Sequence, residues 1–145
     1  MPSCYFLALA SDSSLDRDTN NFSLFKLTEE MQITISGTPP QGPVLPIELH
    51  AYWMFEPGEI GRSFEFQFLF EKPEAGVKSE PIPLQSDKKR LRVRNRGLPV
   101  LPNGEFRVRT QWRAVGENEW HLEPQIWPVE VKRVQQLDSE APTNT

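Results

Sequence analysis

Every second residue from position 64 to position 70 is a phenylalanine: Phe64, Phe66, Phe68 and Phe70. The residues between and after them are Glu65, Gln67, Leu69 and Glu71. Side chains of a β-strand point alternately to its two faces, whereas a helix would spread these rings around its circumference. The segment therefore predicts a strand that buries its four rings in a core and turns its other face to water.

A second segment, residues 47–56, has the same period. Its apolar series is Ile47, Leu49, Ala51, Trp53 and Phe55. The alternate series is Glu48, His50, Tyr52, Met54 and Glu56. The turn signal Pro57-Gly58 separates the two segments. We expect a second strand here, with His50 on its exposed face.

Weaker patterns predict the remaining elements. Residues 3–10 are an apolar run, typical of a strand buried on both faces, and residues 11–21 are predicted to be a polar turn. Residues 22–35 are predicted to be a bent strand; a helical turn or two through Leu24, Leu27 and Met31 is the alternative. Prolines and glycines predict a loop over 36–46, and residues 73–86 are predicted to be loop or edge strand.

The C-terminal half alternates again over residues 90–96 and 106–114, the second run following an Asn103-Gly104 turn. In the last segment, residues 120–131, the alternation changes phase near Pro124, as a β-bulge requires. Its two prolines predict an edge strand. Its phase predicts that Trp120 and Leu122 share one face and that His121 is exposed on the other.

Taken together, these segments predict an all-β fold: an immunoglobulin-like two-sheet antiparallel β-sandwich of about 7–8 strands. The 145 residues fit one domain, and 14 prolines fit a chain rich in turns and edges. We expect a single β-sandwich domain over residues 1–134 and a flexible polar tail over 135–145.

Cysteine content and hydropathy bear on the compartment. Cys4 is the only cysteine, so the chain cannot form an internal disulfide, and we expect a reducing environment. The first residues lack the basic start and the length of a signal peptide, and no apolar run approaches the ~20 residues of a membrane span. The sequence therefore predicts a soluble cytoplasmic protein without a membrane partner.

Two groups of residues resemble sites of metal binding or catalysis. Asp16, Asp18 and Asn20 resemble the first half of a calcium loop, but Asn21 and Leu27 stand where glycine and glutamate are needed. Asx turns explain these residues without an ion, so we expect no metal and no cofactor.

A cysteine–histidine pair would need Cys4 as a thiolate, which its apolar run disfavours. The chain has no phosphate-binding glycine loop and no nucleophile elbow. We therefore expect no enzyme; a small hydrolase is a remote alternative.

Four tryptophans raise the question of a carbohydrate platform, because stacked indoles bind sugars. Trp53, Trp112 and Trp127 share the apolar faces of their strands, and core packing is the favoured explanation. Trp120, near the end of a loop, is the one expected to be exposed.

Arginine is the unusual feature of the chain. Residues 88–113 hold nine of the 16 basic residues and a single acid, Glu105, a net charge of +8 that leaves −12 for the remainder. The candidate binding residues are Arg90, Arg92, Arg94, Arg96, Arg107, Arg109 and Arg113. They favour either a stripe that binds an anionic polymer or an acidic partner, or cross-strand pairing with glutamates.

Pairing is the favoured interpretation. In an immunoglobulin-like order the first arginine strand neighbours the strand of Glu65 and Glu71, and the second lies between the strand of Glu48 and Glu56 and the last strand. We therefore expect a non-catalytic interaction module whose partner is another protein, and the net charge of −4 disfavours nucleic acid.

Four short motifs carry a resemblance to a known family. They are residues 5–12 (YFLALASD), 18–21 (DTNN), 22–27 (FSLFKL) and 98–108 (LPVLPNGEFRV). They resemble those of a family of small uncharacterised bacterial β-sandwich proteins, a domain of unknown function, with the last run similar to that family's closing motif of proline, glycine, aromatic residue and alternating strand. The resemblance spans residues 3–131. It implies a sandwich and no particular activity.

Overall fold

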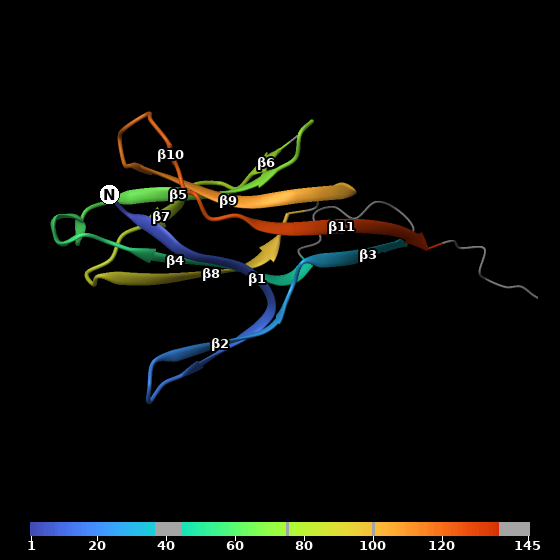
Figure 1. Cartoon of the computed structure of the whole chain (residues 1–145), viewed down its shortest axis with the longest axis horizontal. Helices are drawn as coiled ribbons and strands as arrows, with labels where there is room; N and C mark the ends of the chain where they lie inside the picture. Colours follow the sequence, from blue (N-terminus) through green and yellow to red (C-terminus); the bar gives the residue numbers. More distant parts are fainter. Residues whose placement is uncertain (37–44, 75, 100, 137–145) are drawn as a thin grey trace, which may run out of the picture.

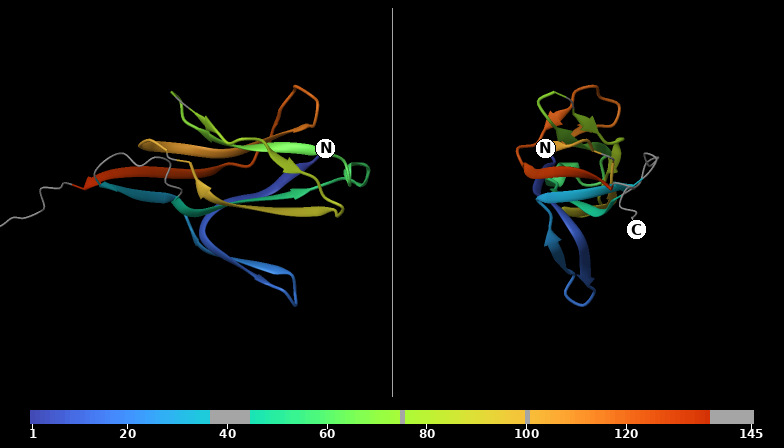
Figure 2. Two further views of the ribbon diagram at one scale, coloured as in Figure 1. Left: turned by 180° about the vertical axis from the view of Figure 1, so that it is seen from behind. Right: turned by 90° about the vertical axis from the view of Figure 1, so that its right-hand side faces the viewer.

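A computed structural model describes residues 1–36, 45–74, 76–99 and 101–136 (Figure 1). The fold is all-β and consists of two sheets (Figures 1 and 2). The four-stranded sheet has the order β2 (Asn21–Leu27), β1 (Ser3–Asp16), β4 (Leu45–Met54) and β8 (Arg90–Leu98). The seven-stranded sheet has the order β3 (Glu30–Ser36), β11 (Trp127–Gln136), β9 (Gly104–Ala114), β5 (Phe64–Glu71) and β6 (Val77–Lys78), with β7 (Ile82–Leu84) on β5 and β10 (His121–Leu122) on β9.

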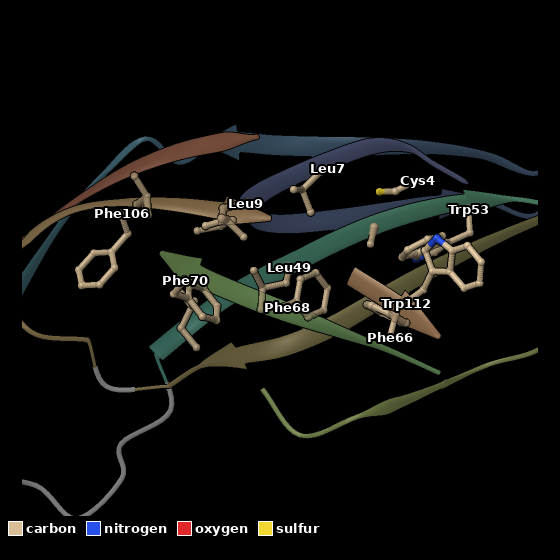
Figure 3. Close-up of a cluster of buried hydrophobic side chains, with 14 of the residues drawn as sticks. Cys4, Leu7, Leu9, Leu49, Trp53, Phe66, Phe68, Phe70, Phe106 and Trp112 are labelled. Atoms are coloured by element: carbon tan, nitrogen blue, oxygen red, sulfur yellow. The ribbon is translucent and has the colours of Figure 1, made fainter. Parts of the chain in front are cut away.

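The two clearest predictions, β4 and β5, are confirmed. All four phenylalanines of β5 are buried, and they face the apolar series of β4 across the space between the sheets (Figure 3). The ring of Phe66 lies 5.1 Å from that of Trp53 and 5.2 Å from that of Phe68, between centroids. Trp112 is also buried and Trp127 packs against the core, so core packing explains these tryptophans.

β1 is longer than predicted. Leu7 and Leu9 enter the core while Ala8 and Ala10 are buried on the opposite face, as expected for residues 3–10. The predicted turn over 11–21 is wrong in its first half, because the strand continues to Asp16 and pairs with β2 as a hairpin. The turn itself is an Asx turn: Asp16 Oδ1 accepts the amides of Asp18, at 2.9 Å, and Thr19, at 3.4 Å.

Residues 22–35 form strands and no helix, but they form two strands in different sheets. The chain leaves β2 at Leu27 and enters β3 at Glu30. At the crossing, the amide of Thr28 donates to Leu9 O at 2.8 Å, and the indole of Trp127 donates to Thr28 O at 2.7 Å. The predicted loop over 36–46 falls mainly on residues 37–44, which lie outside the described residues.

The last segment differs from the prediction in its position. β11 is no edge: it pairs antiparallel with β9 and parallel with β3, so the sandwich is not wholly antiparallel. Pro128 is tolerated because pairing with β3 begins only at Glu130. The predicted change of phase near Pro124 falls where the pairing with β9 is interrupted: β10 ends opposite Gln111, the amide of Glu123 donates to Thr110 O, and β11 resumes at Trp127 opposite Val108.

The described residues form eleven strands, more than the expected seven or eight, because β6, β7 and β10 are short pieces of two or three residues and residues 22–35 form two strands. The segment 73–86 forms two of them, β6 and β7, as expected for an edge. The only helix among the described residues is a single 3₁₀ turn, Pro57–Glu59. β11 continues to Gln136, two residues into the expected tail, and residues 137–145 lie outside the described part.

Candidate interaction surface

The arginines do not form one stripe. Arg90, Arg92, Arg94 and Arg96 belong to β8 in the four-stranded sheet, and Arg107, Arg109 and Arg113 belong to β9 in the other. On each strand the arginines alternate with side chains that pack on the core. The two rows therefore lie on opposite outer faces of the sandwich.

The β9 row is largely paired with glutamates of β5. Arg113 Nε lies 2.6 Å from Glu65 Oε1, and its guanidinium stands 4.3 Å from the ring of Trp120. Arg109 Nη1 lies 3.6 Å from Glu71 Oε1. Arg107 makes no ion pair within the described residues. The expected neighbours were interchanged: the second arginine strand, not the first, lies beside Glu65 and Glu71.

The β8 row lies beside β4 instead. Arg96 Nε is 3.3 Å and Arg94 Nη1 4.0 Å from Glu48 Oε2. Arg94 also donates to Ser13 Oγ at 3.1 Å, and Arg92 donates to Asn20 O at 2.9 Å. Arg90, at the start of the strand, has no ion pair among the described residues.

Ser13 and Asn20 belong to the β1–β2 hairpin, which leaves the body of the sandwich and runs below β4 and β8 in Figure 1. Side chains bridge the space between them. The ring of Phe22 lies 6.3 Å from that of Tyr52 and 6.4 Å from that of His50, between centroids. The guanidinium of Arg92 stands over both the Phe22 and Tyr52 rings, at 5.1 and 5.8 Å. The hairpin thus covers part of the outer face of the four-stranded sheet.

His50 lies beneath this cover, and its predicted exposure is wrong. The histidine is 0% exposed and Glu48 is 5% exposed. His50 Nε2 is 3.0 Å from Glu48 Oε1; a carboxylate only accepts, so Nε2 carries the proton. The opposite nitrogen, Nδ1, is buried and has no partner.

Burial and charge act on this pair in opposite directions. Burial lowers the pKa of His50 below 6.5, although the Glu48 carboxylate works against it. For Glu48, burial raises the pKa, but hydrogen bonds from Ser13 and His50 and the charge of Arg94 outweigh it. The net effect is a pKa below 4.5. The pair is therefore a neutral histidine that donates to a carboxylate.

The remaining histidine and the cysteine lie apart from this pair. The ring of His121 stacks on that of Trp112 at 4.4 Å, so it is half-buried, while Leu122 is exposed; the predicted phase of residues 120–122 is inverted. Cys4 is buried on the core face, and burial raises the pKa of its thiol to about 11. His50 points to the other face of the same sheet, so the two do not meet.

The free edge of β8 is the feature that sequence reasoning missed. Within the described ranges, β8 is the last strand of its sheet and β4 is its one neighbour. Leu91 and Val93 pack on the core but stay half-exposed, because no described strand covers them from the open side. Period-two alternation identifies a strand and its faces, but it carries no information about which neighbour is absent.

The outer side of the larger sheet has a groove of about 960 Å³. It lies where β5, β9 and β11 meet the start of β3, and its lining includes Glu29, Glu71, Lys72, Glu105 and Arg107. No group of three or more metal-ligating side chains occurs in the described part of the chain. None of its helices is long and apolar enough to cross a membrane.

Comparison with known proteins does not assign the chain to a family: no protein-family model and no curated protein matches it.

Proposed function

We propose that the chain is a non-catalytic protein-binding module that takes up its partner along the open edge of β8. The observation that carries this proposal is an edge of nine residues, Arg90–Leu98, that no other strand of the described residues covers. Proteins usually protect such edges with proline, a bulge or an inward-pointing charge. The side chains of β8 that face the core are Leu91, Val93, Asn95 and, past the irregular pairing at Gly97, Leu98, so neither proline nor inward-pointing charge is present.

The finer description of the fold belongs to the same proposal. β4 and β8 lie in one sheet, β5, β9 and β11 lie in the other, and β3 runs parallel to β11. This arrangement supports an immunoglobulin-like connectivity with the β1–β2 hairpin as an addition. Membership of the family of small bacterial sandwich proteins, and a cytoplasmic location, are further parts of the proposal.

The second candidate function is binding of an anionic polymer by the β8 arginines. Lys88, Lys89 and Arg90 are exposed and favour it. The separation of the arginines into two rows on opposite faces disfavours it, because the β8 and β9 rows cannot contact one polymer as a single stripe. A hydrolase is less well supported, since Cys4 and His50 face opposite sides of their sheet.

Site-specific photo-cross-linking tests the docking surface. A photoreactive residue is placed at Arg90 on β8 or, as the matched control, at Arg107 on the opposite face; both are exposed and without ion pairs. In extract of the native host we expect one defined protein adduct at position 90, competed by unlabelled protein, and none at position 107. No adduct at position 90, or equal adducts at both positions, contradicts the proposal.

Heparin and single-stranded RNA test the second candidate. We expect the folded protein to pass a heparin column near physiological salt, because its arginine rows lie on opposite faces and are mostly paired. Retention that falls steeply with salt and is lost in Arg92→Gln/Arg94→Gln would favour the polymer-binding function. A log–log slope of about −0.7 per phosphate contact would count the arginines involved.

A further inference from the structure

The backbone of β8 divides its residues into two sets. The amide of Phe55 donates to Lys89 O at 2.8 Å, immediately before β8 begins. In an antiparallel ladder, bonded and non-bonded positions alternate, so Leu91, Val93 and Asn95 exchange backbone bonds with β4. The backbone N–H and C=O groups of the residues between them face the open edge. These residues are Arg90, Arg92, Arg94 and Arg96.

The core side of this edge lacks apolar cover. Leu91 and Val93 are half-buried although they pack against the central cluster. An added strand would place its own side chains about 4.5–5.5 Å from theirs on the same face. Apolar residues at these positions of the incoming strand would complete the burial that β4 provides from the other side.

The outer side of the edge has an excess of positive charge. Glu48 is the acidic side chain that forms ion pairs with β8 in the described part of the chain, and it serves both Arg94 and Arg96. Lys88 and Lys89 extend the positive series at one end, beside the unpaired Arg90. Incoming residues opposite the arginines would therefore be stabilised by carboxylates and destabilised by lysine or arginine.

The same charge disfavours the β8 edge of a second copy of the chain as the occupant. Two β8 strands paired about a two-fold axis would place one arginine row against the other. Like charges directly opposite each other destabilise a strand pair. The occupant is thus a different segment with acidic character.

We infer that the β8 edge receives an extended segment in which acidic side chains alternate with apolar ones, added to the four-stranded sheet as a fifth strand. This inference rests on the proposed protein-binding function and specifies its partner. Backbone hydrogen bonds to the arginine positions supply the affinity, and the two faces of the segment supply the specificity.

A synthetic peptide tests this chemistry directly. The probe is a fluorescein-labelled nonapeptide that alternates glutamate with valine. Its controls are a peptide of the same composition with the glutamates in one block and a lysine–valine version. We expect the alternating peptide to bind, the block peptide to bind at least about ten-fold more weakly, and the lysine peptide not to bind. On binding, amide exchange should slow at Arg90, Arg92, Arg94 and Arg96, and much less at Leu91 and Val93.

Two variants of one residue separate charge from backbone. Arg94→Gln removes the charge and should weaken peptide binding about two- to five-fold, the range of one cross-strand ion pair. Arg94→Pro removes the same charge and also the N–H that faces the open edge, so it should weaken binding at least about ten-fold. Proline is tolerated at such edge positions, and equal melting temperatures of the two variants show that the fold survives.

The outcomes discriminate between the partner chemistry and the docking surface. Equal binding of the alternating and block peptides, or full competition by a heparin fragment, overturns strand addition and indicates general anion binding. Absence of binding by all peptides overturns the acidic-strand chemistry. If the host protein still cross-links at position 90, the β8 surface stands and only its occupant was misassigned; if it does not, the proposed function fails as well.

Discussion

His50 shows how a single residue can escape an alternating pattern. It lies on the solvent side of β4, between Glu48 and Tyr52, and yet it is fully buried because Phe22 of the hairpin packs over it. Its unpartnered Nδ1 is the atom that would take up a proton, and burial disfavours the resulting charge. Protonation of His50 therefore destabilises the folded state.

We predict that lowering the pH below about 6.5 destabilises the protein through His50. The pKa of His50 in the folded state is depressed below 6.5, so the unfolded chain binds the proton more readily. The free energy of unfolding therefore decreases as the pH falls below 6.5. Glu48, with its pKa below 4.5, adds a second loss only at lower pH. Urea unfolding at pH 7.5, 6.0 and 5.0 measures the slope. The variant His50→Gln should flatten it between pH 6.5 and 5, and an unchanged slope would contradict a buried neutral histidine.

Substitutions in the core should lower the free energy of unfolding far more than substitutions at the surface. Phe66→Ala or Phe68→Ala should lower the free energy of unfolding by ~3–5 kcal/mol, because each removes a fully buried ring that packs against its neighbours. Phe25→Ala is the control, since its ring is 49% exposed and its loss should change stability by less than about 0.5 kcal/mol. Denaturant midpoints of the three variants measure the difference. A core variant as stable as the parent would refute the packing of β5.

At this scale the sequence predicted which residues face the core on β4 and β5, because period two directly encodes the face of a strand. It failed at residues 120–122 because so short a segment does not fix the phase, and His121 lies opposite the core-facing Trp112. It failed at His50 for a different reason. Alternation predicts the face of the strand on which a side chain lies. Whether that face is exposed to solvent depends on whether another segment of the chain covers it. Phe22 comes from another strand, and no local pattern connects it with His50.

Among the elements, the β1–β2 hairpin contacts β4 and β8 through side chains of Phe22, Arg92 and Arg94. Arg92 of β8 donates to Asn20 O in the turn of the hairpin, and Arg94 donates to Ser13 Oγ on β1. The same two arginines belong to the surface proposed for the partner. Binding at the β8 edge and closure of the hairpin therefore draw on the same side chains.

We predict that Arg92→Gln/Arg94→Gln loosens the hairpin while the sandwich stays folded. The free energy of unfolding should fall by about 1 kcal/mol or less, because both side chains are partly exposed. Amide exchange over residues 12–25 should nevertheless accelerate clearly, since the contacts to Asn20 and Ser13 are lost. Arg90→Gln/Arg107→Gln removes two charges that make no ion pair and is the control. Equal exchange in both double variants would mean that the arginines do not hold the hairpin.

Strand positions were largely predictable from the sequence, whereas strand neighbours were not. The alternation over 90–96 and 106–114 located β8 and β9. The predicted neighbours of the two strands, β4 and β5, were interchanged, because the pattern of one segment does not determine which strand lies beside it. Residues 22–35 illustrate the same limit. Their β-propensity was recognised, but the crossing at Thr28 depends on Leu9 and Trp127, which are distant in sequence.

In the molecule as a whole, β11 is the strand that joins β3 to the rest of the larger sheet. It pairs with β9 on one side and with β3 on the other. Val131, 1% exposed, points from it into the core. We predict that Val131→Asp abolishes cooperative unfolding or costs several kcal/mol, because it buries an unpaired carboxylate. Lys132→Gln on the same strand should shift the denaturant midpoint only slightly. A cooperative, parent-like transition in the aspartate variant would show that β11 is dispensable.

The parallel pairing of β3 with β11 also sets the order in which a growing chain can fold. Glu30 pairs opposite Glu130, so β3 must wait for 100 more residues to be added before its neighbour exists. At about 5–20 residues per second, this delay lasts roughly 5–20 s. The hairpin and the β4–β5 region can form early, but the larger sheet cannot be completed on the ribosome until β11 has left the exit tunnel. During that interval β3 is an unpaired strand, and it is the segment of the nascent chain that chaperones would most need to shield.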